Sequence, residues 1–105
     1  MKKIELRLSY IQAEALFQML QIYVSFKQRH IRHNLERLII AVIELAKLYI
    51  YKRIMFHYKG EKKFKFDVSM GFAMYEALPN VEETNELYDS VVRMVIIEIG
   101  KQLPE

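Results

Sequence analysis

The feature that most constrains this chain is a stretch of about 50 residues, residues 9–59, without glycine or proline. Those two residue types most readily end a helix, so nothing in the stretch forces the backbone out of one. A single helix of that length would be about 75 Å long at 1.5 Å per residue. That length is implausible for a chain of 105 residues, so the polar run at residues 27–34 is the expected break between two helices.

The first of these helices is marked by polar residues at steps of four and three, with apolar residues around the rest of its circumference. This spacing places the polar side chains in one stripe along a helix. The stripe consists of Glu14, Gln18, Gln21, Ser25 and Gln28. Ser9 precedes the helix, where a serine commonly caps the first turn.

The second helix is predicted to begin at Leu35, with Asn34 as its N-cap. Apolar side chains cover most of its girth, which predicts that it is the central, most buried helix. Its most hydrophobic part, residues 38–50, contains Glu44 and Lys47. Each charge would cost about 2.5–3.5 kcal/mol inside a bilayer, so we expect a core helix and no membrane partner.

Residues 3–8 and 63–68 alternate strictly between polar and apolar, the pattern of half-buried strands. Residues 53–59 also alternate, which favours a hairpin turning around residues 59–62. The competing interpretation continues the second helix to Lys59, with Gly60 as its C-cap. With the hairpin, three strands share an apolar inner face and a basic outer face.

The rest of the chain predicts two more helices. One covers residues 69–78, capped by Ser69 and ended by Pro79. Asn80 and Glu83 have the spacing of a capping box for the last helix, which is expected to end at Gly100. The predicted fold is α+β, a single domain over residues 1–105. It has about four α-helices packed on a small two- or three-stranded, largely antiparallel sheet.

The chain also contains an internal similarity, because residues 2–9 and 62–69 both read Lys-Lys, three alternating apolar residues, then Ser. Each segment precedes a helix that contains Glu-Ala-Leu, although the second copy is offset there by two residues. A duplicated strand–helix–helix unit would explain the match. Independent selection of alternating strands with serine caps explains it equally well.

No catalytic, cofactor or metal site is expected. His30 and His33 could share a helix face, but the adjacent Arg29 and Arg32 would repel a cation. There is no cysteine, no glycine-rich phosphate loop, and no serine within a Gly-x-Ser-x-Gly motif. The missing cysteines and the lack of a visible signal peptide favour a reducing, cytoplasmic location.

Charge is divided unevenly along the chain. Residues 1–65 carry fourteen Lys or Arg against five Asp or Glu, a net of +9, and residues 66–105 carry two against eight, a net of −6. The acidic part could pack on the basic part in one molecule or in another subunit, or the basic part could meet a polyanion. The candidate residues for binding a polyanion or a partner are Lys3, Arg7, Arg29, Arg32, Arg37, Arg53, Lys59, Lys63 and Lys65.

The opening of the chain resembles the ribbon-helix-helix DNA-binding proteins in outline, with an alternating strand bearing Lys3, Glu5 and Arg7 before two helices. The resemblance covers the first 45 residues and implies contact with nucleic acid. The first helix is longer than in that family, the expected glycine turn between the helices is missing, and residues 50–105 have no counterpart. These departures leave the resemblance short of family membership.

The sequence alone does not determine the function. The preferred hypothesis is a non-enzymatic interaction or regulatory module, a homodimer that binds protein partners. Open sheet edges and the apolar girth of the second helix both favour pairing of two copies. The alternative is a nucleic-acid-binding regulator that uses the basic sheet face and the basic turn between the helices. Abundant Ile, Lys, Tyr and Phe fit a bacterial or phage source.

Overall fold

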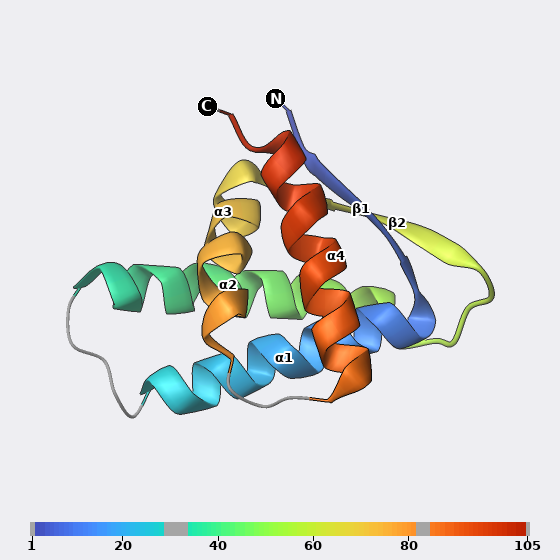
Figure 1. Cartoon of the computed structure of the whole chain (residues 1–105), viewed down its shortest axis with the longest axis horizontal. Helices are drawn as coiled ribbons and strands as arrows, with labels where there is room; N and C mark the ends of the chain where they lie inside the picture. The colour runs from blue at the N-terminus through green and yellow to red at the C-terminus, as the bar shows by residue number, and fades with distance from the viewer. Residues whose placement is uncertain (1, 29–33, 82–84, 105) are drawn as a thin grey trace.

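The computed structural model describes residues 2–28, 34–81 and 85–104. Its described elements are β1 (Ile4–Ser9), α1 (Tyr10–Gln28), α2 (Asn34–Arg53), β2 (Glu61–Phe66), α3 (Val68–Ala77), the short 3-10 helix η1 (Leu78–Asn80) and α4 (Glu86–Gln102). The predicted α+β fold is confirmed, with four helices packed on a two-stranded antiparallel sheet (Figure 1).

The sheet pairs the two segments that alternate most strictly. Ile4 lies opposite Phe66 and Leu6 opposite Phe64, in antiparallel register. The side chains of these four residues are at most 1 % exposed, because they face the helices and join the hydrophobic core. Alternation therefore predicted both strands and most of their buried face, but β2 covers residues 61–66 rather than 63–68, and Val68 begins α3.

The third predicted strand is wrong, and so is the helical alternative. The helix α2 ends at Arg53, and residues 54–60 form an irregular connection to β2. Side chains hold this connection: the Tyr58 hydroxyl donates to the Leu8 carbonyl at 2.9 Å, and the His57 ring lies 4.5 Å from that of Tyr10. Gly60, with φ of +69°, makes the turn into β2 in a conformation that favours glycine.

The central helix is α1, not α2 as the sequence predicted. Seven residues of α1 are buried, including Leu16, Met19 and Leu20, against four in α2. Glu14, Gln18, Gln21 and Ser25 of its polar stripe are exposed, as predicted, together with the apolar Ile11 and Phe26. The core of this chain therefore covers only one side of α2, and apolar residues on its other side remain exposed.

Of the predicted N-caps, Ser9 is confirmed and Ser69 is not. Ser9 caps α1 as predicted, because its Oγ accepts from the Gln12 N–H at 3.2 Å and Gln12 Oε1 accepts from the Ser9 N–H at 2.9 Å. The helix α3 begins one residue before the predicted cap Ser69, with Asp67 at the N-cap position. The helix α4 is capped by Asn85, whose side chain accepts from the Tyr88 N–H.

The caps predicted at the two ends of the last helix also differ from the structure. Asn80 is not a cap of α4 but lies in η1, where its amide donates to the Glu76 carbonyl at 2.9 Å. Its predicted partner Glu83 lies outside the described residues. The helix α4 also continues two residues past Gly100, to Gln102.

The two Lys-Lys segments prove to be the two strands, paired with each other. Glu5 lies opposite Lys65, and the pairs Ile4–Phe66 and Leu6–Phe64 flank them. The sequence similarity equates Ile4 with Phe64, so a local two-fold axis through Glu5 and Lys65 would exchange the strands. The arrangement is consistent with a duplicated strand–helix–helix unit, and the duplication itself stays a prediction.

Candidate functional site

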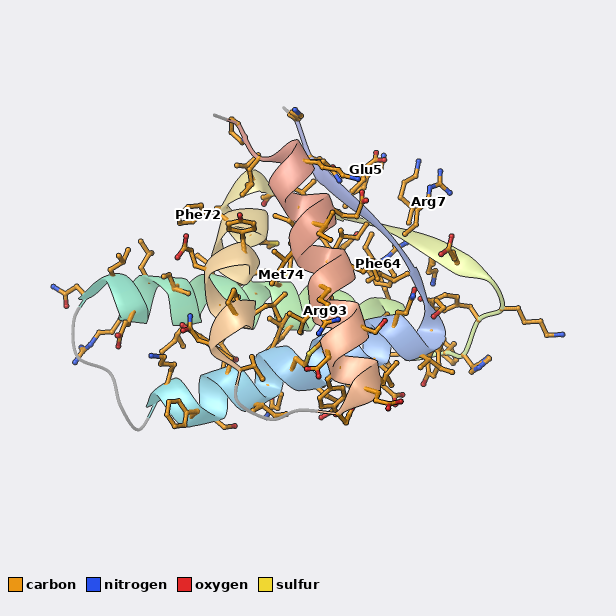
Figure 2. The ribbon with its side chains drawn as sticks, in the orientation of Figure 1. Glu5, Arg7, Phe64, Phe72, Met74 and Arg93 are labelled. Atoms are coloured by element: carbon orange, nitrogen blue, oxygen red, sulfur yellow. The ribbon has the colours of Figure 1, made fainter. Side chains whose placement is uncertain are left out.

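The outer face of the sheet brings together four of the predicted cationic residues. Lys3 and Arg7 come from β1 and its approach, and Lys63 and Lys65 from β2. Figure 2 shows Arg7 and Glu5 on the side of the strands away from the helices, and Phe64 between the strands and the helices. Alternation in paired strands is sufficient to gather these residues, as the sequence predicted.

Carboxylates lie among these cations and neutralise most of them. Lys3 forms an ion pair with Asp67. Lys63 Nζ and Lys65 Nζ lie 3.8 and 3.9 Å from the carboxylate of Glu5. Such exposed pairs contribute little to stability, about 0–1 kcal/mol each, but they reduce the positive potential that a polyanion would feel.

The net charge of this face is small. Its four cations stand against Glu5, Glu61 and Asp67, which leaves a net of +1. Arg7 is the one cation among the four that pairs with none of the described carboxylates. The face is therefore a mixed-charge surface rather than the basic platform that the list of cations predicted.

The remaining predicted cations do not join this face. Arg53 Nη2 donates to the Lys63 carbonyl at 2.8 Å, and its guanidinium lies 5.7 and 5.2 Å from the rings of Tyr49 and Phe64. Arg53 thus holds the edge of β2 in place. Lys59 is exposed in the connection before β2. Arg37 is exposed near the N-terminus of α2, the end of that helix which lies away from the strands in Figure 1. Arg29 and Arg32 lie outside the described residues.

The acidic helix α4 does not neutralise the basic half of the chain within the described residues. Glu86 and Asp89 in its first turn are exposed and form no ion pair there with residues 2–65. Glu98 pairs instead with Lys101 of the same helix, at 3.4 Å. Of the three explanations for the divided charge, packing within one molecule gains no support from these two residues.

Both sheet edges are covered by side chains from helices. On the β1 edge, the Gln102 amide accepts from the Glu5 N–H at 2.7 Å and donates to the Glu5 carbonyl at 2.8 Å. On the β2 edge, the Tyr49 hydroxyl accepts from the Lys65 N–H at 2.9 Å. The outward backbone groups that a second copy would need are therefore already bonded at these positions, which weakens the expectation of dimerisation through the strands.

The most conspicuous surface feature is the outer face of α2, the helix whose apolar girth predicted that it would be the most buried. Leu38, Leu45 and Leu48 are 61, 58 and 50 % exposed on it, with the small, exposed Ala41 between them. The opposite side of the helix carries Ile43 and the other buried residues. The apolar girth of α2 already indicated this second stripe, because a helix that is apolar all round must have every side covered.

A second apolar area continues from the end of α2. Met55 and Phe56 are 59 and 82 % exposed in the connection after the helix. Beside them is a hollow of about 310 Å³ between α1 and α2. It is lined by Tyr10, Glu14, Phe17, Gln18, Tyr51, Ile54 and Met55.

Another hollow lies beside the outer face of the sheet and is lined mostly by polar side chains. It has a volume of about 500 Å³ and is lined by Glu5, Arg7, Gln12, Glu61, Met94, Glu98 and Gln102. Glu5, Gln12, Glu98 and Gln102 already have structural partners. Within residues 2–28, 34–81 and 85–104, no polar or charged residue is buried and no three potential ligands gather to hold a metal ion.

Burial of tyrosines is the main electrostatic perturbation in the described part of the chain. Burial raises the pKa of Tyr58, although the nearby Arg53 opposes that shift. Burial also raises the pKa of Tyr23, and the charges of Glu36 and Glu76 add to the increase. These shifts keep both hydroxyls neutral to higher pH and do not indicate an acid–base catalyst.

Comparison with known proteins adds no assignment to these surfaces. None of the helices formed by the described residues is long and apolar enough to cross a membrane. The chain matches no known family profile, no curated protein and no solved structure.

Proposed function

We propose that this protein is a non-enzymatic interaction module that acts as a homodimer in the cytoplasm and binds protein partners. The observation that carries the proposal is the apolar outer face of α2, with three leucines at least half exposed. Contiguous apolar surface of this kind is typical of protein–protein interaction sites. The absence of cysteine suits a reducing compartment.

The free energy available from this face favours a reversible dimer. Covering a half-exposed leucine gains roughly 1 kcal/mol, so three leucines from each of two subunits contribute roughly 6 kcal/mol. Association costs about 4–15 kcal/mol in lost translational and rotational freedom, so burial of neighbouring side chains must contribute further free energy. We therefore expect a dimer that dissociates on dilution.

A separate surface is suited to the protein partner. Phe56 is 82 % exposed beside the hollow between α1 and α2, and Met55 forms part of that hollow's lining. Aromatic side chains next to a hollow commonly anchor protein partners. Four of the seven residues that line the hollow belong to α1 and two follow α2, so a dimer formed through the outer face of α2 would leave the hollow accessible except near Tyr51.

Size-exclusion chromatography with light scattering over a concentration series tests the proposal. We expect the mass to rise from 12.6 kDa toward twice that value as concentration increases. Leu45→Glu combined with Leu48→Glu should hold the protein at the monomer mass, with an unchanged circular dichroism spectrum because both side chains face solvent. The control is Ile97→Glu, compared with Leu45→Glu alone, because each introduces one carboxylate at a similarly exposed leucine or isoleucine. Ile97 is 56 % exposed on α4, and its substitution should leave the dimer intact.

A wild-type protein that stays at the monomer mass at every concentration would overturn the proposal. The same columns, run with duplex and single-stranded nucleic acid, test the alternative function. Co-elution that weakens steeply with added salt would replace the proposal with a nucleic-acid-binding regulator. The mixed charge of the sheet face favours no co-elution.

A further inference from the structure

The outer face of α2 has the spacing of a helix-pairing seam. Leu38, Ala41, Leu45 and Leu48 follow one another at steps of three, four and three residues, which keeps them in one line along the helix. The three leucines are 50–61 % exposed and Ala41 is also exposed. Ile43, on the opposite side of the helix, is fully buried in the core. The seam therefore points away from the chain's own core.

The large and small residues of this seam fit against a second copy of the seam that runs in the opposite direction. If a second α2 lies antiparallel, with a two-fold axis that crosses the seam at the level of residue 43 along the helix, Leu38 meets Leu48 of the partner subunit. In the same register Ala41 meets Leu45 of the partner subunit, so each small residue receives a large one. Such alternation of large and small residues lets two helices interdigitate.

A parallel arrangement fits less well. It would place each Ala41 against Ala41 of the partner subunit and leave a void between the helices at that layer. Voids of this kind reduce stability because the lining atoms lose their packing partners. The order of residues in the seam therefore favours antiparallel over parallel pairing.

From this pattern we propose that the outer face of α2 is a two-fold interface between two copies of this chain, with the helices antiparallel and centred at the level of residue 43. The inference rests on the proposed homodimer and specifies its partner surface and geometry. A closed two-fold contact uses the same patch on both subunits, so it leaves no seam open to a third copy.

The residues that flank the seam are compatible with this register. On one side Arg37 comes opposite Tyr51 of the partner subunit, where a guanidinium can lie over the ring. Glu44 comes near its own symmetry mate, which is unfavourable. Lys47, whose Nζ lies 3.0 Å from Glu44 Oε1, reduces that repulsion.

Cysteine cross-linking tests the geometry, since the natural chain has no cysteine. Leu38→Cys and Leu48→Cys are prepared separately, then oxidised alone and as an equal mixture. In the antiparallel register the mixture forms a disulfide-linked dimer joining one protein of each kind. Each variant alone stays unlinked, because its two cysteines would lie about 15 Å apart along the helices, too far for a disulfide.

Efficient linking of Leu38→Cys with itself would instead show parallel pairing and overturn the antiparallel proposal. Absence of linking in the mixture, with a dimer still present by light scattering, would place the interface elsewhere and leave the homodimer standing. Absence of any wild-type dimer by light scattering would overturn both proposals. Ile97→Cys, equally exposed on α4, is the control for random collision and should not link.

Discussion

At the scale of single residues, the tightest constraint is the approach of α3 to β1. Gly71 is buried, and a Cβ atom added there would lie 2.8 Å from Cγ1 of Ile4. Ile4 is itself fully buried in the core and cannot turn away into solvent. Gly100 in α4 is less constrained, because its added Cβ would meet the ring of Tyr75, a partly exposed side chain, at 3.3 Å.

Gly71→Ala is therefore expected to destabilise the protein. Forcing an extra methyl group into a packed core costs about 1–3 kcal/mol, and the better helix propensity of alanine offsets up to about 1 kcal/mol of that. Thermal unfolding should show a fall of several degrees in Tm. Gly100→Ala is the matched control and should leave Tm unchanged or slightly higher; an equal fall in both variants would contradict the explanation.

At the scale of elements, the edges of the sheet are maintained by side chains at equivalent positions of the two strands. The Glu5 N–H is bonded by Gln102 of α4, and the Lys65 N–H by Tyr49 of α2. Glu5 and Lys65 face each other in the ladder and are equated by the similarity of the two Lys-Lys segments. Each strand is thus closed by the second helix of the other strand–helix–helix unit.

Gln102→Ala should open the β1 edge. The substitution removes two hydrogen bonds of 2.7 and 2.8 Å to Glu5, and we expect a loss of about 1–2 kcal/mol because water replaces part of them. Hydrogen exchange of the Glu5 amide should accelerate. Lys101→Ala, which removes only an exposed ion pair with Glu98, is the control; if it accelerated the Glu5 amide as much, Gln102 would not be the cause.

At the scale of the whole molecule, a single hydrophobic cluster joins the inner face of the sheet to all four helices. Tyrosine hydroxyls lie at the margin of this cluster. The Tyr58 hydroxyl donates to the Leu8 carbonyl, and burial raises the pKa of both Tyr58 and Tyr23 above the usual value of 10.0. The folded state therefore keeps both hydroxyls protonated at a pH where the unfolded chain loses its protons.

Stability is consequently expected to fall in strong alkali. A group whose pKa is raised on folding contributes its stabilisation in full below the unfolded value, near 10, and loses it as pH rises through the folded value. The free energy of unfolding, measured between pH 8 and pH 11, should decline above about pH 10. Tyr58→Phe should reduce the slope of that decline and lower stability at pH 8, by about 1 kcal/mol for the lost hydrogen bond. An unchanged slope would show that Tyr58 does not titrate with unfolding.

The elements that could be predicted from the amino-acid pattern are those whose pattern repeats along the chain. Alternation predicted both strands and most of their buried face, the polar stripe predicted α1, and the Ser9 cap followed from its position before that helix. These features depend on neighbours in the chain, which share one backbone geometry. The same reasoning gathered Lys3, Arg7, Lys63 and Lys65 on one face of the sheet.

Which surfaces are covered, and by which segments, depends on contacts between distant parts of the chain and could not be predicted from local pattern. Residues 53–59 alternate like a strand, but no backbone pairing with β2 is open to them: β1 pairs with one edge of β2, and the side chains of Tyr49 and Arg53 bond the other. The apolar girth of α2 was assigned to the core, yet α1 occupies the centre and leaves Leu38, Leu45 and Leu48 in solvent. Apolar periodicity shows that a side chain must be covered, whereas the arrangement of distant segments determines whether the cover comes from the same chain or from another.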